Sequence, residues 1–221
     1  MALGEQGAKV VGIDPVEIAV SMSDERAKTY GLDNLSFRHM NATDIDGEFE
    51  KGQFELIIFF ASLEHMTHRE RKASLQAAWN LLEPGGHLGV VEAPNRLWFF
   101  DDHTASMPFF HWLPDNIARQ YLDRHNGEPA TSEAGDEDEM LDFMRLGRGV
   151  SYHEFELALG DLSELPVVSD RYTFQNRQNL LRRAYFGLTR KGRYSRFLRR
   201  LSGDMHPGFF MPYLNIVFRK T

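Results

Sequence analysis

Hydrophobic and polar positions in the first half of the chain follow two alternating periods. Short apolar runs rich in β-branched residues predict strands at 9–14, 35–40, 54–61 and 87–92. Between them, apolar positions three and four residues apart predict helices over 15–31 and 69–83. Strands that alternate with helices predict βαβ units, and therefore a doubly wound α/β fold with a mostly parallel sheet.

Burial expectations follow from the same pattern. The run at 54–61 is nearly all apolar, which is typical of a central strand buried on both faces. Ile18 and Met22 share the apolar face of the first helix. Ligands of such sheets bind beyond the carboxyl ends of the strands. The polar residues that follow each strand are therefore site candidates, namely Asp14, Asp44, the segment 62–65 and the segment 92–95.

The second half of the chain carries an aromatic segment and two further predicted strands. Pro114 and Asp115 predict the start of a helix through Leu122, and the spacing of Ser151 and Glu154 predicts a capping box that opens a helix through Leu159. Strands are predicted over 165–169 and 213–219. Six aromatic side chains gather within fifteen residues of the segment that follows the fourth strand: Trp98, Phe99, Phe100, Phe109, Phe110 and Trp112. They indicate either the wall of a pocket for a small organic ligand or the core of a helical cap.

Composition narrows the possible chemistry. The 221 residues contain no cysteine, which excludes disulfides, thiolate metal sites and cysteine nucleophiles. The net charge of −7 argues against wholesale nucleic-acid binding. The apolar runs are too short to span a bilayer, and no signal-peptide pattern opens the chain, so we expect a cytoplasmic protein.

Charge is unevenly distributed along the chain. Seven acids and no base fall between Glu128 and Asp142, in a stretch that predicts a mobile surface loop. Ten bases and no acid fall between Arg171 and Gly203, which we call the basic arm. One interpretation of the basic arm is a solvated helical face whose arginine stems cover apolar surface. Others are a patch for an anionic substrate, nucleic acid or membrane headgroups, or a latch closed by the acidic stretch.

Four motifs, in order, carry a family resemblance: KVVGIDP, NATDID, FELIIFFASLEHM and LLEPGGHLGVVEAPN. They resemble class I S-adenosylmethionine-dependent methyltransferases, and are closest to the group that acts on small molecules and has a Glu-His pair after the strand that corresponds to 54–61. LLEPGG is the most specific element. The resemblance implies a Rossmann-like sheet with an antiparallel edge strand at 213–219. It divides one domain into a cofactor-binding core at 1–95, a substrate cap with the acidic loop at 96–150, and a part at 151–221 that returns to the core and carries the basic helical insertion.

The resemblance also implies roles for individual residues. Asp14, followed by Pro15, would accept hydrogen bonds from the ribose diol of S-adenosylmethionine; the alternative is a helix cap. Asp44 would bind the adenine amino group with Ile45 against the ring; the alternative is a plain Asx turn. Ala61 and Ser62 would line the sulfonium side of the cofactor.

Candidate groups for the acceptor follow from the Glu-His pair and the aromatic segment. His65, His103 and His111 are the candidate proton acceptors, each with a structural hydrogen bond as its alternative. The expected substrate-binding residues are Glu64, Trp98, Phe100, Asp102, Phe110 and Trp112. No metal is expected, because relatives that bind one carry an acid three residues before the glutamate, where this chain has Ala61. An Asp102–His103 metal pair lacks a third ligand in the sequence.

One family hallmark does not appear. The first strand and its glycine-rich loop should precede the strand at 9–14, but only eight residues precede Lys9. We expect that the natural protein is longer or its start misplaced. The alternative is a degenerate, non-catalytic binding or scaffold protein. A nicotinamide-dependent dehydrogenase is a third hypothesis, which leaves LLEPGG unexplained. A small-molecule acceptor is the expected partner, with specific nucleic-acid binding not expected and membrane contact through the basic arm left open.

Overall fold

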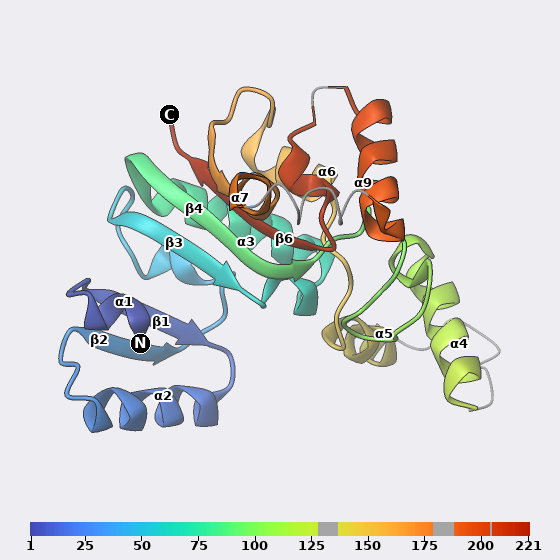
Figure 1. Ribbon diagram of the computed structural model, residues 1–221. Helices are drawn as coiled ribbons and strands as arrows, with labels where there is room; N and C mark the ends of the chain where they lie inside the picture. The colour runs from blue at the N-terminus through green and yellow to red at the C-terminus, as the bar shows by residue number, and fades with distance from the viewer. Residues whose placement is uncertain (128–136, 179–187, 204) are drawn as a thin grey trace. The chain divides into compact units, whose positions relative to one another are not determined.

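The computed structural model describes residues 1–127, 137–178, 188–203 and 205–221. The chain divides into two compact units, Met1–Glu50 and Lys51–Thr221, and each is described by itself. The expected mixed α/β fold is confirmed, with parallel strand pairs in both units (Figure 1).

The first unit is a small parallel sheet with its helices. It contains α1 (Ala2–Glu5), β1 (Val10–Asp14), α2 (Glu17–Thr29), β2 (Leu35–His39) and the 3-10 turn η1 (Ile45–Gly47). β1 and β2 pair in parallel along their whole length. Gly31 follows the end of α2 with φ 63°, the left-handed conformation that is expected of a glycine terminating a helix. The expectation that Ile18 and Met22 face the core is wrong, because their side chains are 68% and 62% exposed.

The second unit contains a four-stranded sheet in the order β3-β4-β6-β5. The strands are β3 (Phe54–Phe60), β4 (Leu82–Pro94), β5 (Val167–Asp170) and β6 (Tyr213–Arg219). The helices are α3 (His68–Leu81), α4 (Asp115–Asn126), α5 (Glu137–Arg145), α6 (Tyr152–Leu159), α7 (Arg171–Gln178) and α9 (Arg190–Leu201). The described residues of the unit also form the 3-10 turns η2 (Leu63–His65), η3 (Phe110–Trp112) and η4 (Pro207–Phe210).

β3 is an edge strand of its sheet and not a central one. It pairs with β4 on one side only, in parallel. Leu56, Ile58 and Phe60 are 40%, 41% and 62% exposed, so the strand is not buried on both faces. The apolar run predicted burial correctly for Phe59, whose side chain points into the core. It predicted burial wrongly for Leu56, Ile58 and Phe60, which alternate with Phe59 along the strand and point to the opposite face.

β6 also occupies a different place from the one expected. It is antiparallel, as predicted, but it lies between β4 and β5, and the short β5 forms the edge. Leu214, Ile216 and Phe218, which alternate along the strand and share one face, are fully buried, so this face of β6 packs into the core.

The LLEPGG motif joins α3 directly to β4. α3 ends at Leu81 and the strand begins at Leu82, so the glycines lie inside the strand and not in a separate turn. A Cβ on Gly86 would lie 2.9 Å from the carbonyl oxygen of Glu83 and 3.2 Å from that of Glu55. Only glycine therefore lets β3 and the start of β4 approach this closely.

The acidic stretch is only partly what its composition predicted. Residues 128–136 lie outside the described residues. The rest is not a loop, because 137–145 form α5. Three acids, Glu137, Asp138 and Glu139, stand in its first turn, where they interact favourably with the partial positive charge of the helix N-terminus.

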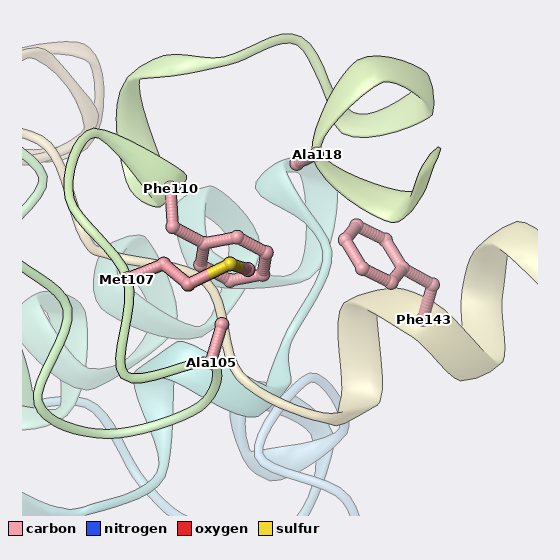
Figure 2. Close-up of a cluster of buried hydrophobic side chains, with 5 residues drawn as sticks. All are labelled: Ala105, Met107, Phe110, Ala118 and Phe143. Carbon is pink, nitrogen blue, oxygen red and sulfur yellow. The ribbon is translucent and has the colours of Figure 1, made fainter. Parts of the chain in front are cut away.

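The aromatic segment is held together by its own buried cluster (Figure 2). Phe110 lies at its centre, and the other members are Ala105, Met107, Ala118 and Phe143. α4 and α5, which supply Ala118 and Phe143, lie beside one another in the ribbon (Figure 1). The cap interpretation of the aromatic residues is therefore confirmed for Phe110.

Candidate functional site

The loop after β3 carries the Glu-His pair. Ala61 begins it at φ 43°, a left-handed conformation that is uncommon for a residue with a Cβ. η2 then turns Glu64 fully into the protein interior, where neither carboxylate oxygen has a hydrogen-bond partner among the described residues. Burial raises the pKa of the Glu64 carboxyl above its ordinary range. A buried carboxylate without a partner is costly, so this group requires an explanation.

Arg71 of α3 fixes the backbone of this loop. Its side chain is fully buried and donates hydrogen bonds to the carbonyl oxygens of Leu63 (2.7 Å) and Glu64 (3.1 Å). It also donates to the carbonyl oxygens of Arg148 and Gly149, and pairs with the Glu154 carboxylate at 3.0 Å. One guanidinium thus joins the site loop to the segment before α6.

The ion pair is completed by Glu154, the residue that also closes the predicted capping box at Ser151. Burial alone would raise the pKa of Glu154, but hydrogen bonding from His68 and the charge of Arg71 outweigh burial and lower it. The capping box itself is confirmed, since Ser151 accepts from the Glu154 N–H and the Glu154 side chain accepts from the Ser151 N–H.

Arg145, at the end of α5, holds His65. The ring Nδ1 of His65 lies 2.8 Å from the carbonyl oxygen of Arg145, and the Arg145 guanidinium donates to the carbonyl oxygen of His65 at 2.7 Å. The same guanidinium forms a two-pronged ion pair with Glu70, at 2.6 and 2.7 Å. This reciprocal arrangement fixes the orientation of the imidazole.

The Glu70–Arg145 pair predicts how the stability of the fold depends on pH in the acid range. The hydrogen bond from Arg145 lowers the pKa of Glu70 from 4.5 to about 2. Because the folded-state pKa is depressed, the contribution is present above pH 4.5 and is lost as the pH falls toward about 2. We expect the difference in urea midpoint between wild type and Glu70→Gln to be constant near neutrality and to shrink across this window. Arg145→Met should remove the same pH dependence; a difference unchanged at about pH 2 would contradict the assignment.

His103 reaches the same loop from the aromatic segment. Its Nδ1 lies 2.9 Å from the Thr104 hydroxyl oxygen. That hydroxyl donates its own proton to the carbonyl oxygen of Gly147 at 2.8 Å, so it can only accept from His103. A Cβ on Gly147, at φ 122°, would lie 2.8 Å from the His103 ring, so glycine is required there.

Glu64, His65 and His103 therefore form one cluster. The Nε2 atoms of His65 and His103 lie 3.9 and 3.8 Å from Glu64 Oε1, and the two rings are 5.6 Å apart. One side-chain atom from each residue lies within 4.8 Å of the others. The side chains of His65 and His103 are 42% and 27% exposed, so solvent reaches the cluster from the imidazole side.

His111 does not join this cluster. It is buried, its Nδ1 accepts the N–H of Gly149, and its Nε2 lies 3.1 Å from Asp101 Oδ1. Burial would raise the pKa of Asp101, but bonding from His111 and from the Ala105 N–H lowers it below its usual range. Since both ring nitrogens face protein groups, the structural alternative describes His111 better than the role of proton acceptor.

The expected substrate residues differ in accessibility. Trp98 and Phe110 are fully buried, and Phe110 belongs to the cap cluster. Phe100 is half-buried, whereas Trp112 is 44% exposed. Asp102 lies beside His103 on the surface and pairs with Lys191 of α9 at 3.3 Å. Substrate contact stays a prediction for all five.

The helix α9, which belongs to the basic arm, packs on the aromatic segment through Tyr194. Tyr194 lies edge-on to Trp98 at 5.3 Å and donates its hydroxyl to the carbonyl oxygen of Leu97 at 2.7 Å. The outer face of the helix carries Arg193, Arg196, Phe197 and Arg200. Tyr185 and Phe186 of the basic arm lie outside the described residues. The ion pair between Lys191 and Asp102 anchors α9 at a residue outside the acidic stretch.

The expected cofactor residues are divided between the two units. Asp14 ends β1, and its Oδ1 accepts the N–H of Val16 at 2.8 Å, with Pro15 between them. Asp44 accepts from the Thr43 hydroxyl at 3.0 Å and precedes η1, in which Ile45 is buried. Both carboxylates thus make the local contacts that their alternatives described. Ala61 and Ser62 lie in the second unit, directly after β3.

Sequence reasoning missed the residues that hold the cluster in place. Arg71, Arg145 and Thr104 carry no motif, and their partners lie more than forty residues away in several cases. The one local signal was the Thr67–Glu70 capping box, which brings Glu70 to Arg145. Among the described helices, none combines the length and the apolar character needed to cross a bilayer.

Comparison with known proteins agrees with the motifs. Residues 1–86 match the family described as "Methyltransferase domain". A curated protein named ATP phosphoribosyltransferase, from Mesorhizobium japonicum (strain LMG 29417 / CECT 9101 / MAFF 303099), is 30% identical over 129 residues, which cover 56% of this chain and 50% of that protein. The chain thus spans about half the length of this curated relative.

Two solved structures are similar over larger parts of the chain. A S-adenosylmethionine-dependent methyltransferase from Methanosarcina mazei is 19% identical, with a TM-score of 0.47, over 76% of this chain and 74% of that one. Geranyl diphosphate C-methyltransferase from Streptomyces coelicolor A3(2) is 13% identical, with a TM-score of 0.45, over 96% and 62%. Residues 1–86 of this chain thus match the methyltransferase domain family, and this match supports the resemblance to class I S-adenosylmethionine-dependent methyltransferases over this part of the chain.

Proposed function

We propose that this protein transfers a methyl group from S-adenosylmethionine to a small organic or lipid-like acceptor. The observation that carries the proposal is the family match over residues 1–86, which contain Asp14 and Asp44 at the positions that would bind ribose and adenine. A carboxylate after a parallel strand is suited to accept both hydroxyls of a ribose.

The transfer itself needs little from the protein. The acceptor atom attacks the methyl carbon in line, the carbon–sulfur bond breaks, and S-adenosylhomocysteine leaves as a neutral thioether. A proton lost by the acceptor passes to a nearby base. His65 and His103 are suited to this step, because each ring donates through Nδ1 to a protein oxygen and keeps a free lone pair on Nε2.

Calorimetry with S-adenosylhomocysteine tests the cofactor assignment. We expect Asp14→Asn to weaken binding by about 10–100-fold, since hydrogen bonds to a charged group contribute more than neutral ones. Asp24→Asn, in the adjoining helix α2, is the matched control and should bind like wild type. The measurement is made on the 221-residue chain and on a form extended upstream. Equal affinity of both variants, or no binding by the extended form, would overturn the proposal.

A non-catalytic binding protein with this fold is the second candidate. It is favoured by the local contacts of Asp14 and Asp44, whose carboxylates accept from the Val16 N–H and the Thr43 hydroxyl, as their structural alternatives describe. This candidate predicts a stable chain that binds no S-adenosylhomocysteine in either form. The calorimetric experiment therefore decides between the two.

A further inference from the structure

We propose that Glu64, His65 and His103 bind a divalent transition-metal ion. The proposal goes beyond methyl transfer and stands on the cluster alone. Two imidazoles and one carboxylate, with further coordination positions open to solvent, are the protein ligands of many zinc and iron(II) sites.

The first argument is the state of Glu64. Its side chain is fully buried, and in the part of the chain that the structure describes no group donates a hydrogen bond to either carboxylate oxygen. The Arg71 guanidinium, which lies near, bonds to the Glu64 carbonyl oxygen and not to the carboxylate. Because a buried unpaired carboxylate is costly, a cation bound between Glu64 and the two imidazoles would supply the missing partner.

The second argument is the orientation of the two imidazoles. His65 Nδ1 faces the carbonyl oxygen of Arg145, which can only accept, so Nδ1 carries the proton. His103 Nδ1 faces the Thr104 hydroxyl, whose own proton is donated to Gly147, so Nδ1 carries the proton there as well. Both Nε2 atoms therefore present a lone pair toward Glu64. Donation of the second ring N–H to a protein oxygen is the usual support of a metal-bound histidine.

The third argument is distance. Nε2 of each histidine lies 3.8–3.9 Å from Glu64 Oε1, too far for a hydrogen bond. Two ligand atoms on one tetrahedral ion lie about 3.4 Å apart, given bonds of roughly 2.1 Å. Each nitrogen–oxygen distance thus needs to shorten by about half an ångström around an ion, and the three ligand atoms already lie within 4.8 Å of one another. The sequence led us to expect no metal because Ala61 stands where metal-binding relatives carry an acid. In the structure His103, from the aromatic segment, joins Glu64 and His65 as a third possible ligand.

The ligand set favours borderline ions over hard ones. Imidazole nitrogen suits zinc, iron and cobalt, whereas magnesium and calcium prefer oxygen ligands. With an ion bound, the two histidines act as ligands and are no longer free proton acceptors. The acceptor molecule would then meet a cation at this position.

Metal titration of the untagged full chain tests the proposal without any activity assay. We expect one Zn²⁺ per chain by calorimetry, and visible absorption from a four- or five-coordinate site with Co²⁺. His103→Ala and Glu64→Gln should each weaken Zn²⁺ binding by more than about tenfold. Mutating residues that only orient metal ligands already lowers metal affinity by at least this factor. His153→Ala is the control, because His153 is exposed and outside the cluster. Circular dichroism checks that each variant is folded.

Two results would overturn the proposal. One is that His103→Ala binds Zn²⁺ as tightly as the control His153→Ala does. Since the side chain of His103 is partly exposed, His103→Ala is the variant least expected to disturb folding. The other is binding of Mg²⁺ as tight as that of Zn²⁺. Both read out metal binding, so they remain distinct from failure to bind S-adenosylhomocysteine.

Discussion

Arg71→Met should lower the free energy of unfolding of the second unit by about 3–5 kcal/mol, the cost of leaving a buried charge without its partner. The substitution keeps the length and apolar stem of the side chain but removes its donors. Glu154 then loses its buried counter-ion, and four carbonyl oxygens lose a hydrogen bond, those of Leu63, Glu64, Arg148 and Gly149. Urea denaturation followed by tryptophan fluorescence reports on this unit, since all three tryptophans follow Lys51.

Arg69→Met is the matched control for this prediction. Arg69 lies on the same helix two residues earlier, and its side chain is exposed, so its removal should change stability by less than about 0.5 kcal/mol. Arg71→Lys should recover only part of the loss, because an ammonium group cannot reproduce the planar fork of donors. Equal stability of the two methionine variants would show that the buried network contributes nothing.

Phe110→Ala should cost about 3–5 kcal/mol, the range found for a fully buried phenylalanine. Its ring is 0% exposed, meets Phe143 edge-on at 6.1 Å, and lies 4.7 Å from the Arg148 guanidinium carbon. The substitution would leave a cavity between the aromatic segment and α5, and the buried Arg148 guanidinium would lose the nearer of its two aromatic neighbours, keeping only Phe143. Thermal and urea unfolding measure the loss.

The neighbouring residue supplies the comparison. Phe109 has a ring that is 48% exposed and contacts Trp112 at 5.0 Å, so Phe109→Ala should cost less than about 1 kcal/mol. If Phe110→Ala left stability unchanged and altered only the KM for an acceptor, Phe110 would be a pocket residue as the sequence first suggested. The cap cluster of Figure 2 predicts the opposite order.

Local patterns predicted the elements well, because each depends on neighbours in sequence. The five-residue strands β1 and β2, the stop at Gly31 and the capping box at Ser151 all follow from residues within one turn or strand. The position of β6 did not follow, because strand order depends on pairing between distant segments. For the same reason the apolar run of β3 could not reveal that it has a partner on one side only.

The candidate site shows the same limit. The Glu64–His65 pair could be recognised as a motif. That His103 lies beside this pair could not be predicted, because it depends on the aromatic segment folding back onto the loop. Arg71 was invisible, since an arginine on a helix is usually exposed and only the tertiary structure surrounds this one with carbonyl oxygens. The sequence offered His65, His103 and His111 as equal candidates for the proton acceptor. Only the structure shows that His111 is buried, with both ring nitrogens facing protein groups.

The position of β6 has a consequence during synthesis. Residues 213–219 fill the place between β4 and β5, so the ribosome has made nearly the whole second unit before its sheet can close. Until Arg219 leaves the exit tunnel, the inner edge of β4 has no partner, and its backbone donors and acceptors stand open to other chains. Vectorial synthesis thus makes the newly made chain most prone to aggregation just before its last strand is released.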